Sequence, residues 1–224
     1  MRRTFALLFL FSLTACTQSP YDTSTPEKLV ASMGLIGQQP ETADPLPYFY
    51  EKEAATAIAQ FDRLGAQGLA AFDKFRDLVA MKFPKYVQRN RTGMLKVTLD
   101  GFNGLKVRTF TFSASTIGGQ LKERQPSDYE FIAATEPDED GIAQLTMKIL
   151  GNEKTLPLIK TSAGFKIYME EKAMDNIKAS IDQLGQLEQV FVNANQLLEA
   201  GDITEENFED KMEVILLEYR DALK

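Results

Sequence analysis

The chain of 224 residues contains no histidine and no tryptophan, and it has a single cysteine, Cys16. The absence of histidine removes the commonest general base, the usual activator of a nucleophile and the commonest zinc ligand. One cysteine cannot form a disulfide bond within the chain. The composition therefore excludes serine–histidine and cysteine–histidine catalysis and His/Cys metal centres. We predict no catalytic residues, no metal site and no cofactor, and an enzyme built from this chain would depend on carboxylates, lysine or tyrosine.

Positive charge is also scarce. The chain has 25 Lys and Arg against 32 Asp and Glu, which gives a formal net charge of −7. An acidic protein is repelled by nucleic acid and by anionic lipid headgroups. We therefore expect no nucleic-acid partner, and charge is not expected to hold the protein to a membrane.

The first sixteen residues have the features of a bacterial export signal. Two arginines precede an apolar stretch at 5–13, which is too short to span a bilayer. The residues Leu13-Thr14-Ala15-Cys16 that complete it resemble the lipobox of bacterial lipoproteins. This resemblance implies cleavage after Ala15 and attachment of lipid to the Cys16 sulfur, with several acyl chains acting as the membrane anchor. The alternative is an ordinary secretory signal that is followed by a chance cysteine.

The residue after the cysteine bears on the destination. Lipoproteins that stay in the inner membrane of diderm bacteria usually carry aspartate there, whereas this chain has Thr17. The lipoprotein resemblance therefore implies a lipid-anchored protein of the cell envelope. In a diderm organism we expect it at the outer membrane, facing the periplasm.

Changes in hydrophobic periodicity divide the chain into four parts. We predict a signal peptide at 1–15, a lipidated polar tether at 16–25, an α+β domain at 26–170 and a C-terminal antiparallel helical hairpin at 171–224. The α+β domain begins with Thr25-Pro26-Glu27, which is typical of a helix start with threonine as the N-cap. Two further helical runs are expected at 48–64 and 66–83, separated at Gly65.

After Gly93 the period changes from that of a helix to the two-residue alternation of strands. The short, turn-rich connections between the later segments require antiparallel neighbours, so the last three strands should form a meander. We expect a single curved antiparallel sheet that the N-terminal helices cover. Its predicted strands are 94–99, 106–114, 129–135, 143–150, 155–161 and 165–169.

The helical period returns at about residue 172 and is interrupted at Gly201-Asp202, after which Thr204 is expected to cap a second helix. The stretch 197–211 resembles the short C-terminal helical module called SHOCT, which is thought to mediate association. The alternative is a plain helix–turn–helix, because capping residues explain the same pattern. The hairpin is our predicted surface for a protein partner or for self-association.

The order of elements, with Thr25-Pro26-Glu27 early and Leu156-Pro-Leu-Ile-Lys160 followed by Phe165-Lys-Ile167 late, resembles the nuclear transport factor 2-like superfamily. The resemblance implies an α+β cone with a concave cavity. Enzymes of this superfamily use an Asp–His or similar pair, so none of their catalytic roles carries over to this chain. The candidate residues either line the cavity or fill a core. They are Met147, Ile149, Phe165 and Ile167.

Two charged stretches are candidate binding sites. The acidic run 136–141 has the alternation of an EF-hand loop, but its twelfth position is Met147 instead of glutamate, so an acidic turn is expected. A basic cluster lies beside Tyr86 and is expected to be a solvated helix end, with an acidic partner or headgroups as the alternative. It comprises Lys82, Lys85, Arg89 and Arg91.

Three functions remain open from the sequence. The first is a lipid-anchored, non-catalytic envelope protein that acts as a binding module. The second is a carrier of a small apolar ligand in the cone-shaped domain. The third is a carboxylate-based enzyme.

Overall fold

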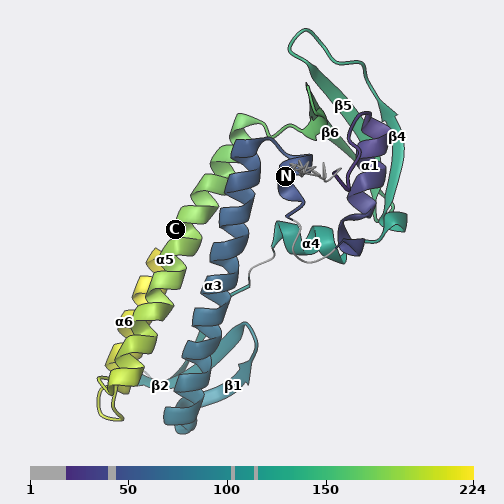
Figure 1. Ribbon diagram of the computed structural model, residues 1–224. Coiled ribbons are helices and arrows are strands. Elements are labelled where there is room, and N and C mark those ends of the chain that lie inside the picture. Colours follow the sequence, from purple (N-terminus) through teal and green to yellow (C-terminus); the bar gives the residue numbers. More distant parts are fainter. Residues whose placement is uncertain (1–18, 40–43, 102–103, 114–115) are drawn as a thin grey trace, which may run out of the picture.

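The computed structural model describes residues 19–39, 44–101, 104–113 and 116–224. The molecule is elongated, with two groups of strands at opposite ends of a pair of long helices, α3 (Lys52–Lys82) and α5 (Glu171–Ala200) (Figure 1). At 1.5 Å per residue each of these helices is about 45 Å long. The pair therefore sets the distance between the two ends of the protein.

Helices α3 and α5 are parallel. Near their first turns Glu53 Oε1 lies 3.1 Å from Lys178 Nζ. Near their last turns Lys74 Nζ lies 2.8 Å from Glu199 Oε1. The partners are separated by the same 125 positions in both contacts, so the two helices keep one register along their length.

One end of the molecule, here the meander lobe, contains a four-stranded antiparallel sheet in the order β4-β5-β6-β7. Its helices pack against the sheet and fill the space between it and the long helices (Figure 1). The sheet consists of β4 (Tyr129–Ala134), β5 (Ile142–Ile149), β6 (Asn152–Thr161) and β7 (Gly164–Ile167). The helical elements are α1 (Pro26–Gly34), η1 (Ile36–Gln38), α2 (Leu46–Phe49), α4 (Ile117–Glu123) and η3 (Pro126–Asp128).

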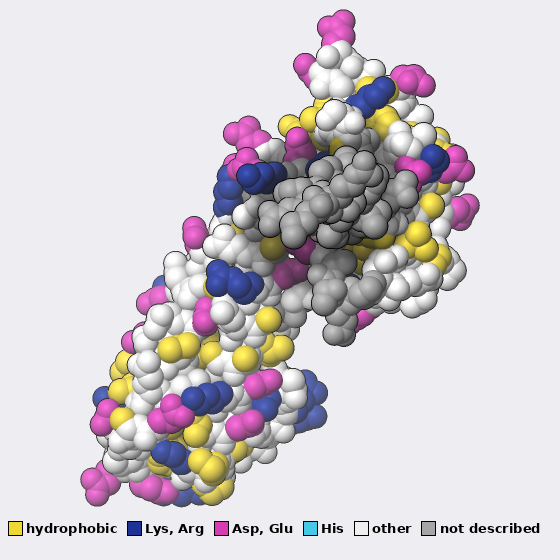
Figure 2. Space-filling model, viewed as in Figure 1, with side chains coloured by type: hydrophobic (Ala, Val, Ile, Leu, Met, Phe, Trp, Pro, Cys, Tyr) yellow, Lys and Arg dark blue, Asp and Glu magenta, His cyan; other side chains and the backbone are white. Residues whose placement is uncertain are grey.

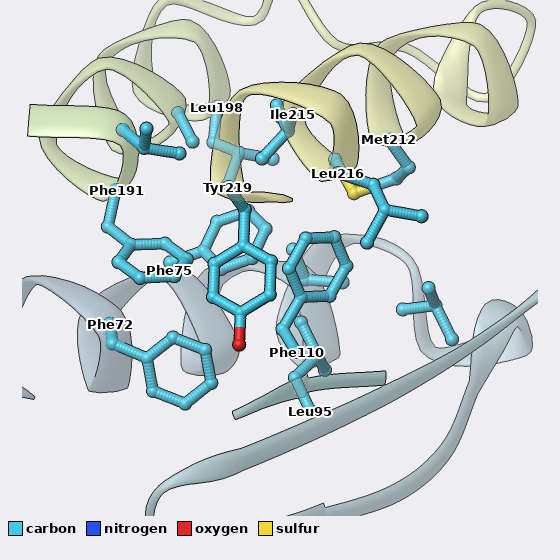
Figure 3. Packing of buried hydrophobic residues seen from close by; sticks show 14 of the residues in the cluster. Phe72, Phe75, Leu95, Phe110, Phe191, Leu198, Met212, Ile215, Leu216 and Tyr219 are labelled. Atoms are coloured by element: carbon cyan, nitrogen blue, oxygen red, sulfur yellow. The ribbon is translucent and has the colours of Figure 1, made fainter. Parts of the chain in front are cut away.

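The other end, here the hairpin lobe, contains a three-stranded sheet in the order β1-β2-β3. Helix α6 (Phe208–Asp221) and the C-terminal halves of α3 and α5 cover one face of this sheet (Figure 3). Their aromatic rings interlock: Phe191 lies 4.8 Å from Phe72 and 5.6 Å from Phe75, centroid to centroid. The remaining elements are η2 (Pro84–Tyr86), β1 (Val87–Arg91), β2 (Met94–Gly101) and β3 (Gly104–Thr111).

The α+β class and the antiparallel pairing are confirmed, and the predicted meander of the last three strands is present as β5, β6 and β7. The prediction of one curved sheet is wrong, because the strands form two separate sheets, and the cone-like shape is not confirmed. The reason is the length of α3, which carries the chain away from the meander lobe before β1, β2 and β3 form as a local unit. Alternation in sequence identifies strands, but it does not say which strands share a sheet.

The two helical runs predicted on either side of Gly65 form one continuous helix, α3. A glycine inside a helix costs only about 1 kcal/mol relative to alanine, which the packing of a long helix readily offsets. A second glycine has a clear steric role, since a Cβ on Gly68 would lie 2.5 Å from Cζ of Phe112. Gly68 thus lets a ring from the hairpin lobe lie directly on the helix.

Helix boundaries follow local hydrogen bonding. The N–H of Lys28 donates to Thr25 Oγ1 at 3.2 Å, which confirms the predicted N-cap of α1. The predicted cap at Thr204 is wrong, because α6 begins at Phe208. The Asn207 side chain holds this turn instead, accepting from the Thr204 N–H at 2.8 Å and donating to the Asp202 carbonyl at 3.0 Å.

Helices α5 and α6 follow one another as a helical hairpin, and α6 is about half as long as α5. The hairpin is not packed apart from the rest of the chain. Phe191 of α5 and Met212 of α6 belong to the same hydrophobic core as Phe75 and Phe110. Residues 171–224 therefore share their core with α3 and with the three-stranded sheet.

Candidate binding surfaces

The predicted lipid-attachment residue Cys16 and the predicted cleavage residue Ala15 lie outside the described residues. The chain just after them is bound to the meander lobe. Tyr21 is only 5% exposed, and its ring lies 5.1 Å from that of Tyr48 and 5.0 Å from that of Phe49. A buried aromatic side chain of this kind fixes the chain at that point.

Hydrogen bonds continue this attachment beyond Tyr21. The Thr23 carbonyl accepts from the Phe165 N–H at 2.7 Å, and a Cβ on Gly164 would lie 2.5 Å from the same carbonyl oxygen. The Asp22 N–H and carbonyl both bond to Ser32 Oγ at 2.9 Å. From Tyr21 onward the predicted tether at 16–25 is thus packed on the body.

The carboxyl of Asp22 forms an ion pair beside this contact. It lies 2.9 Å from Lys28 Nζ, and this cation, together with hydrogen bonds from Ser24, holds the pKa of Asp22 well below its usual range. Both side chains are about half exposed, at 55% and 54%. Solvent-exposed pairs of this kind contribute little to stability, so Tyr21 and the backbone bonds carry the attachment.

The four residues considered as a cavity lining lie in the core of the meander lobe. Met147 is fully buried, Phe165 and Ile167 are nearly so, and Ile149 is half-buried against the same cluster. Leu29 and Phe49 belong to that cluster and pack with them. None of the described grooves discussed below is lined by any of the four.

A groove of about 600 Å³ lies instead between the N-terminal halves of α3 and α5; we call it the stalk groove. Ala57, Met174 and Ile181 give it an apolar floor. Its rim is charged, with Lys52 and Glu53 on α3 and Lys178 and Asp182 on α5. The groove can accept an amphiphile, and its carboxylates and ammonium groups are spread along two helices.

A second groove of about 510 Å³, the hairpin groove, lies between α5 and α6. Leu197 on α5 and Ile215 on α6 supply apolar surface inside it. On its α6 side, Val214 is 51% exposed, and Leu217, one turn further along α6, is 58% exposed. Large apolar side chains at that exposure, gathered beside a groove, are typical of a protein-binding surface.

One tyrosine near the long helices has a strongly shifted pKa. Tyr50 is half-buried where the meander lobe meets the long helices, and burial, followed by the charges of Tyr129 and Asp62, raises its pKa to about 12. Its hydroxyl stays protonated at neutral pH and is poorly suited to act as a base. Within the described ranges, no group of three or more carboxylates or other ligand types is placed to hold a metal ion.

Comparison with protein-family models, with curated proteins and with solved structures finds no match. Any function of the two grooves is therefore inferred from their geometry alone. No helix among the described residues is both long and apolar enough to cross a membrane.

The sequence led us to the C-terminal hairpin but missed the stalk groove. The groove exists because α3 and α5 run parallel, and their residues are far apart in the chain. The sequence contains one indication of this pairing, which is that α3 and α5 each have an apolar stripe and that the two stripes are nearly equal in length. Such stripes show that each helix has a buried face, but they do not identify the partner helix.

Proposed function

We propose that this protein is a lipid-anchored, non-catalytic component of the bacterial cell envelope that binds a protein partner through its hairpin groove. The observation that carries the proposal is the exposure of Val214, which lines that groove, and of Leu217, one turn further along α6. Burying such side chains against a partner contributes about 25 cal/mol for each Å² of apolar surface removed from water.

The attachment of the N-terminal segment supports a role for the long helices as a spacer. Tyr21 is five residues from Cys16, and five extended residues reach about 17 Å at most. A lipid on Cys16 would thus keep the meander lobe close to the bilayer. The hairpin groove lies toward the other end of helices that are about 45 Å long, where a partner in the envelope can reach it.

The absence of catalysis is part of the proposal. Histidine is missing from the whole chain, and Cys16 would be occupied by lipid. The carboxylates of the stalk groove are divided between an ion pair, Glu53 with Lys178, and Asp182 on the rim. This distribution suits a binding surface better than a carboxylate-based enzyme.

Capture from envelopes of the native host tests the proposal. The protein carries a C-terminal tag and is extracted in mild detergent, together with Leu217→Glu and with Leu150→Glu as the matched control. Leu150 is 56% exposed on the meander lobe, so both changes add the same charge at the same exposure. A partner that Leu150→Glu retains and Leu217→Glu loses supports the proposal. Equal capture by both variants would count against the hairpin groove.

The anchor is tested by the Cys16→Ala form. We expect it to lose metabolic labelling with a fatty acid and to leave the membrane fraction. Retention of either property would show that the lipobox resemblance is misleading.

A second function, transport of a small amphiphile, is favoured by the apolar floor of the stalk groove and by the cations Lys52 and Lys178 on its rim. Native mass spectrometry of protein from its host should then show a bound mass of lipid size. Thr56→Phe would fill the groove and remove that mass, whereas Gln67→Phe, on an exposed part of α3, would retain it. A ligand-free mass for the wild-type protein would contradict this function.

A further inference from the structure

The charge of this acidic protein is unevenly distributed along the chain. Residues 82–111 contain seven Lys or Arg and a single acid, Asp100, although the whole chain has a net charge of −7. These residues form the end of α3 and the sheet β1-β2-β3. This segment thus has an excess of cations, whereas the other residues of the chain carry 18 Lys and Arg against 31 Asp and Glu.

Three of the seven cations are bound within the lobe. Lys82 donates to the Leu198 carbonyl, Lys85 pairs with Glu205, and Arg108 pairs with Glu213 at 2.7 Å. The other four form no ion pair within the described part of the chain. They are Arg89, Arg91, Lys96 and Lys106.

The strand register places three of these cations on the outer face of the sheet, whereas Lys106 is paired with the buried Leu99 and lies on the inner face. Leu95 and Val97 point into the core and are fully buried, so Lys96 between them points outward. Lys96 lies directly opposite Arg89 of β1 on one side and directly opposite Thr109 of β3 on the other. We call this surface, with Arg89, Arg91 and Lys96, the basic face.

The pairing of Arg89 with Lys96 is unfavourable in the isolated protein. Like charges directly opposite one another on neighbouring strands destabilise a sheet. Charged residues on an edge strand such as β1 can serve simply to prevent aggregation, but that role does not require a cation opposite another cation. An anionic partner on the basic face would relieve the repulsion.

The chain itself offers such an anion at its opposite end. The β4–β5 connection contains Glu136, Asp138, Glu139 and Asp140, all exposed and without an ion pair in the described residues. Asp138 fixes the turn by accepting from the N–H groups of Asp140 and Ile142 at 3.0 and 2.8 Å. The connection projects from the tip of the meander lobe, whereas β1 and β2 lie at the far end of the long helices (Figure 1).

We propose that the basic face of one molecule binds the acidic β4–β5 connection of a second copy. Acidic side chains gather at the upper tip in the space-filling view, and Lys and Arg side chains line the lower right edge (Figure 2). The contact joins two different surfaces, so each molecule can bind one neighbour at either end and form short chains. The interaction is electrostatic and weakens as salt shortens the range of the charges. It depends neither on the lipid nor on the hairpin groove.

Zero-length cross-linking with a carbodiimide tests this contact, because the reagent joins a lysine to a carboxylate that touches it. Strand β2, which contains Lys96, and the β4–β5 connection, which contains Glu139, lie at opposite ends of the molecule (Figure 1). A link between positions 96 and 139 or 140 must therefore join two copies. We use the full-length protein, purified from host membranes in mild detergent. The expected result is a cross-linked dimer that contains this link, with a yield that falls about fivefold when salt is raised to about 1 M.

Charge reversal provides the controls. Arg89→Glu/Lys96→Glu and Glu139→Lys/Asp140→Lys should each abolish the link, and an equal mixture of the two variants should restore it. Lys154→Glu/Lys172→Glu changes the net charge equally at exposed sites elsewhere and should retain it. The proposal is overturned if the wild-type protein gives no such link, if its yield is insensitive to salt and to reversal, or if the mixture fails to restore it. Binding of anionic vesicles that Arg89→Glu/Lys96→Glu loses, with no link between copies, would assign the basic face to a membrane instead.

Discussion

The two lobes of this protein are assembled in different ways. The sheet of the meander lobe is made by one contiguous segment, 129–167, to which α1 and α2 are added from the N-terminal side. The core of the hairpin lobe collects side chains from three separate segments, at 72–83, 95–112 and 187–222. The hairpin lobe therefore depends on the last helix of the chain, whereas the meander lobe does not.

This difference also separates the proposed roles. The N-terminal segment is fixed to the meander lobe through Tyr21 and Thr23, and the exposed apolar side chains Val214 and Leu217 belong to the hairpin lobe. The meander lobe would be held near the membrane, and the hairpin lobe would bind the protein partner. Changes that affect one lobe and spare the other test whether the two lobes are independent.

Removal of residues 202–224 should have the largest effect. It takes away Phe208, Met212 and Tyr219, all buried in the hairpin-lobe core, and exposes the rings beneath them. We expect β1, β2 and β3 to lose their protection in hydrogen-exchange mass spectrometry while β4–β7 keep theirs. Equal loss in both lobes would show that the protein unfolds as one unit.

Phe191→Ala should destabilise the hairpin lobe by about 4 kcal/mol, because it leaves a large cavity in a packed core. Phe191 is fully buried and its ring contacts those of Phe72, Phe75 and Tyr219. Denaturant unfolding gives the magnitude, and hydrogen exchange gives the location. Met147→Ala, in the core of the meander lobe, is the matched change and should affect β4–β7 instead.

Gly68→Ala should destabilise the protein by roughly 2 kcal/mol, because the new methyl group collides with the Phe112 ring. Gly185→Ala on α5 is the control, since a Cβ there has no neighbour within 4 Å. That change should instead stabilise its helix by about 0.5–1 kcal/mol. If both substitutions change the free energy of unfolding in the same direction, Phe112 does not pack closely against Gly68.

Tyr50 allows the junction between the meander lobe and the long helices to be tested by pH. Its pKa is raised to about 12 in the folded protein, so above pH 10 the unfolded chain loses its proton first. The contribution of Tyr50 to the free energy of unfolding should be fully present below pH 10 and should be lost as the pH rises toward 12. The loss from this residue should be about 1 kcal/mol near pH 11. Thermal unfolding of Tyr50→Phe in the same range should show a correspondingly shallower decline. An unchanged slope would show that Tyr50 is not the group responsible.

Much of the local structure could be predicted from the sequence. Alternation located strands β2 to β7 to within a few residues, and Thr25-Pro26 located the start of α1. Three elements were missed or merged. Strand β1 has polar residues at most of its positions, α4 has no buried residue that would reveal a stripe, and Gly65 suggested a break that packing overrides.

The tertiary arrangement could not be predicted from the sequence to the same extent. The ring contact of Phe72 with Phe191 requires two helices more than a hundred residues apart to lie in one register, and neither stripe specifies its partner. For the same reason the stalk groove could not be anticipated, whereas the hairpin groove is formed by α5 and α6, which are consecutive in the chain.

The parallel course of α3 and α5 has an electrical consequence. Each helix has a macrodipole with its positive pole at the N-terminus, and in a parallel pair the two dipoles add, whereas those of antiparallel neighbours cancel. The charged side chains offset these poles only in part, since Glu53 and Glu171 lie in the first turns and Lys82 lies in the last turn of α3, but the last turn of α5 has no base. The poles that remain lie side by side, positive at the N-terminal ends of the two helices and negative at their C-terminal ends. Beside a charged surface the protein would therefore align along its length before any specific contact forms.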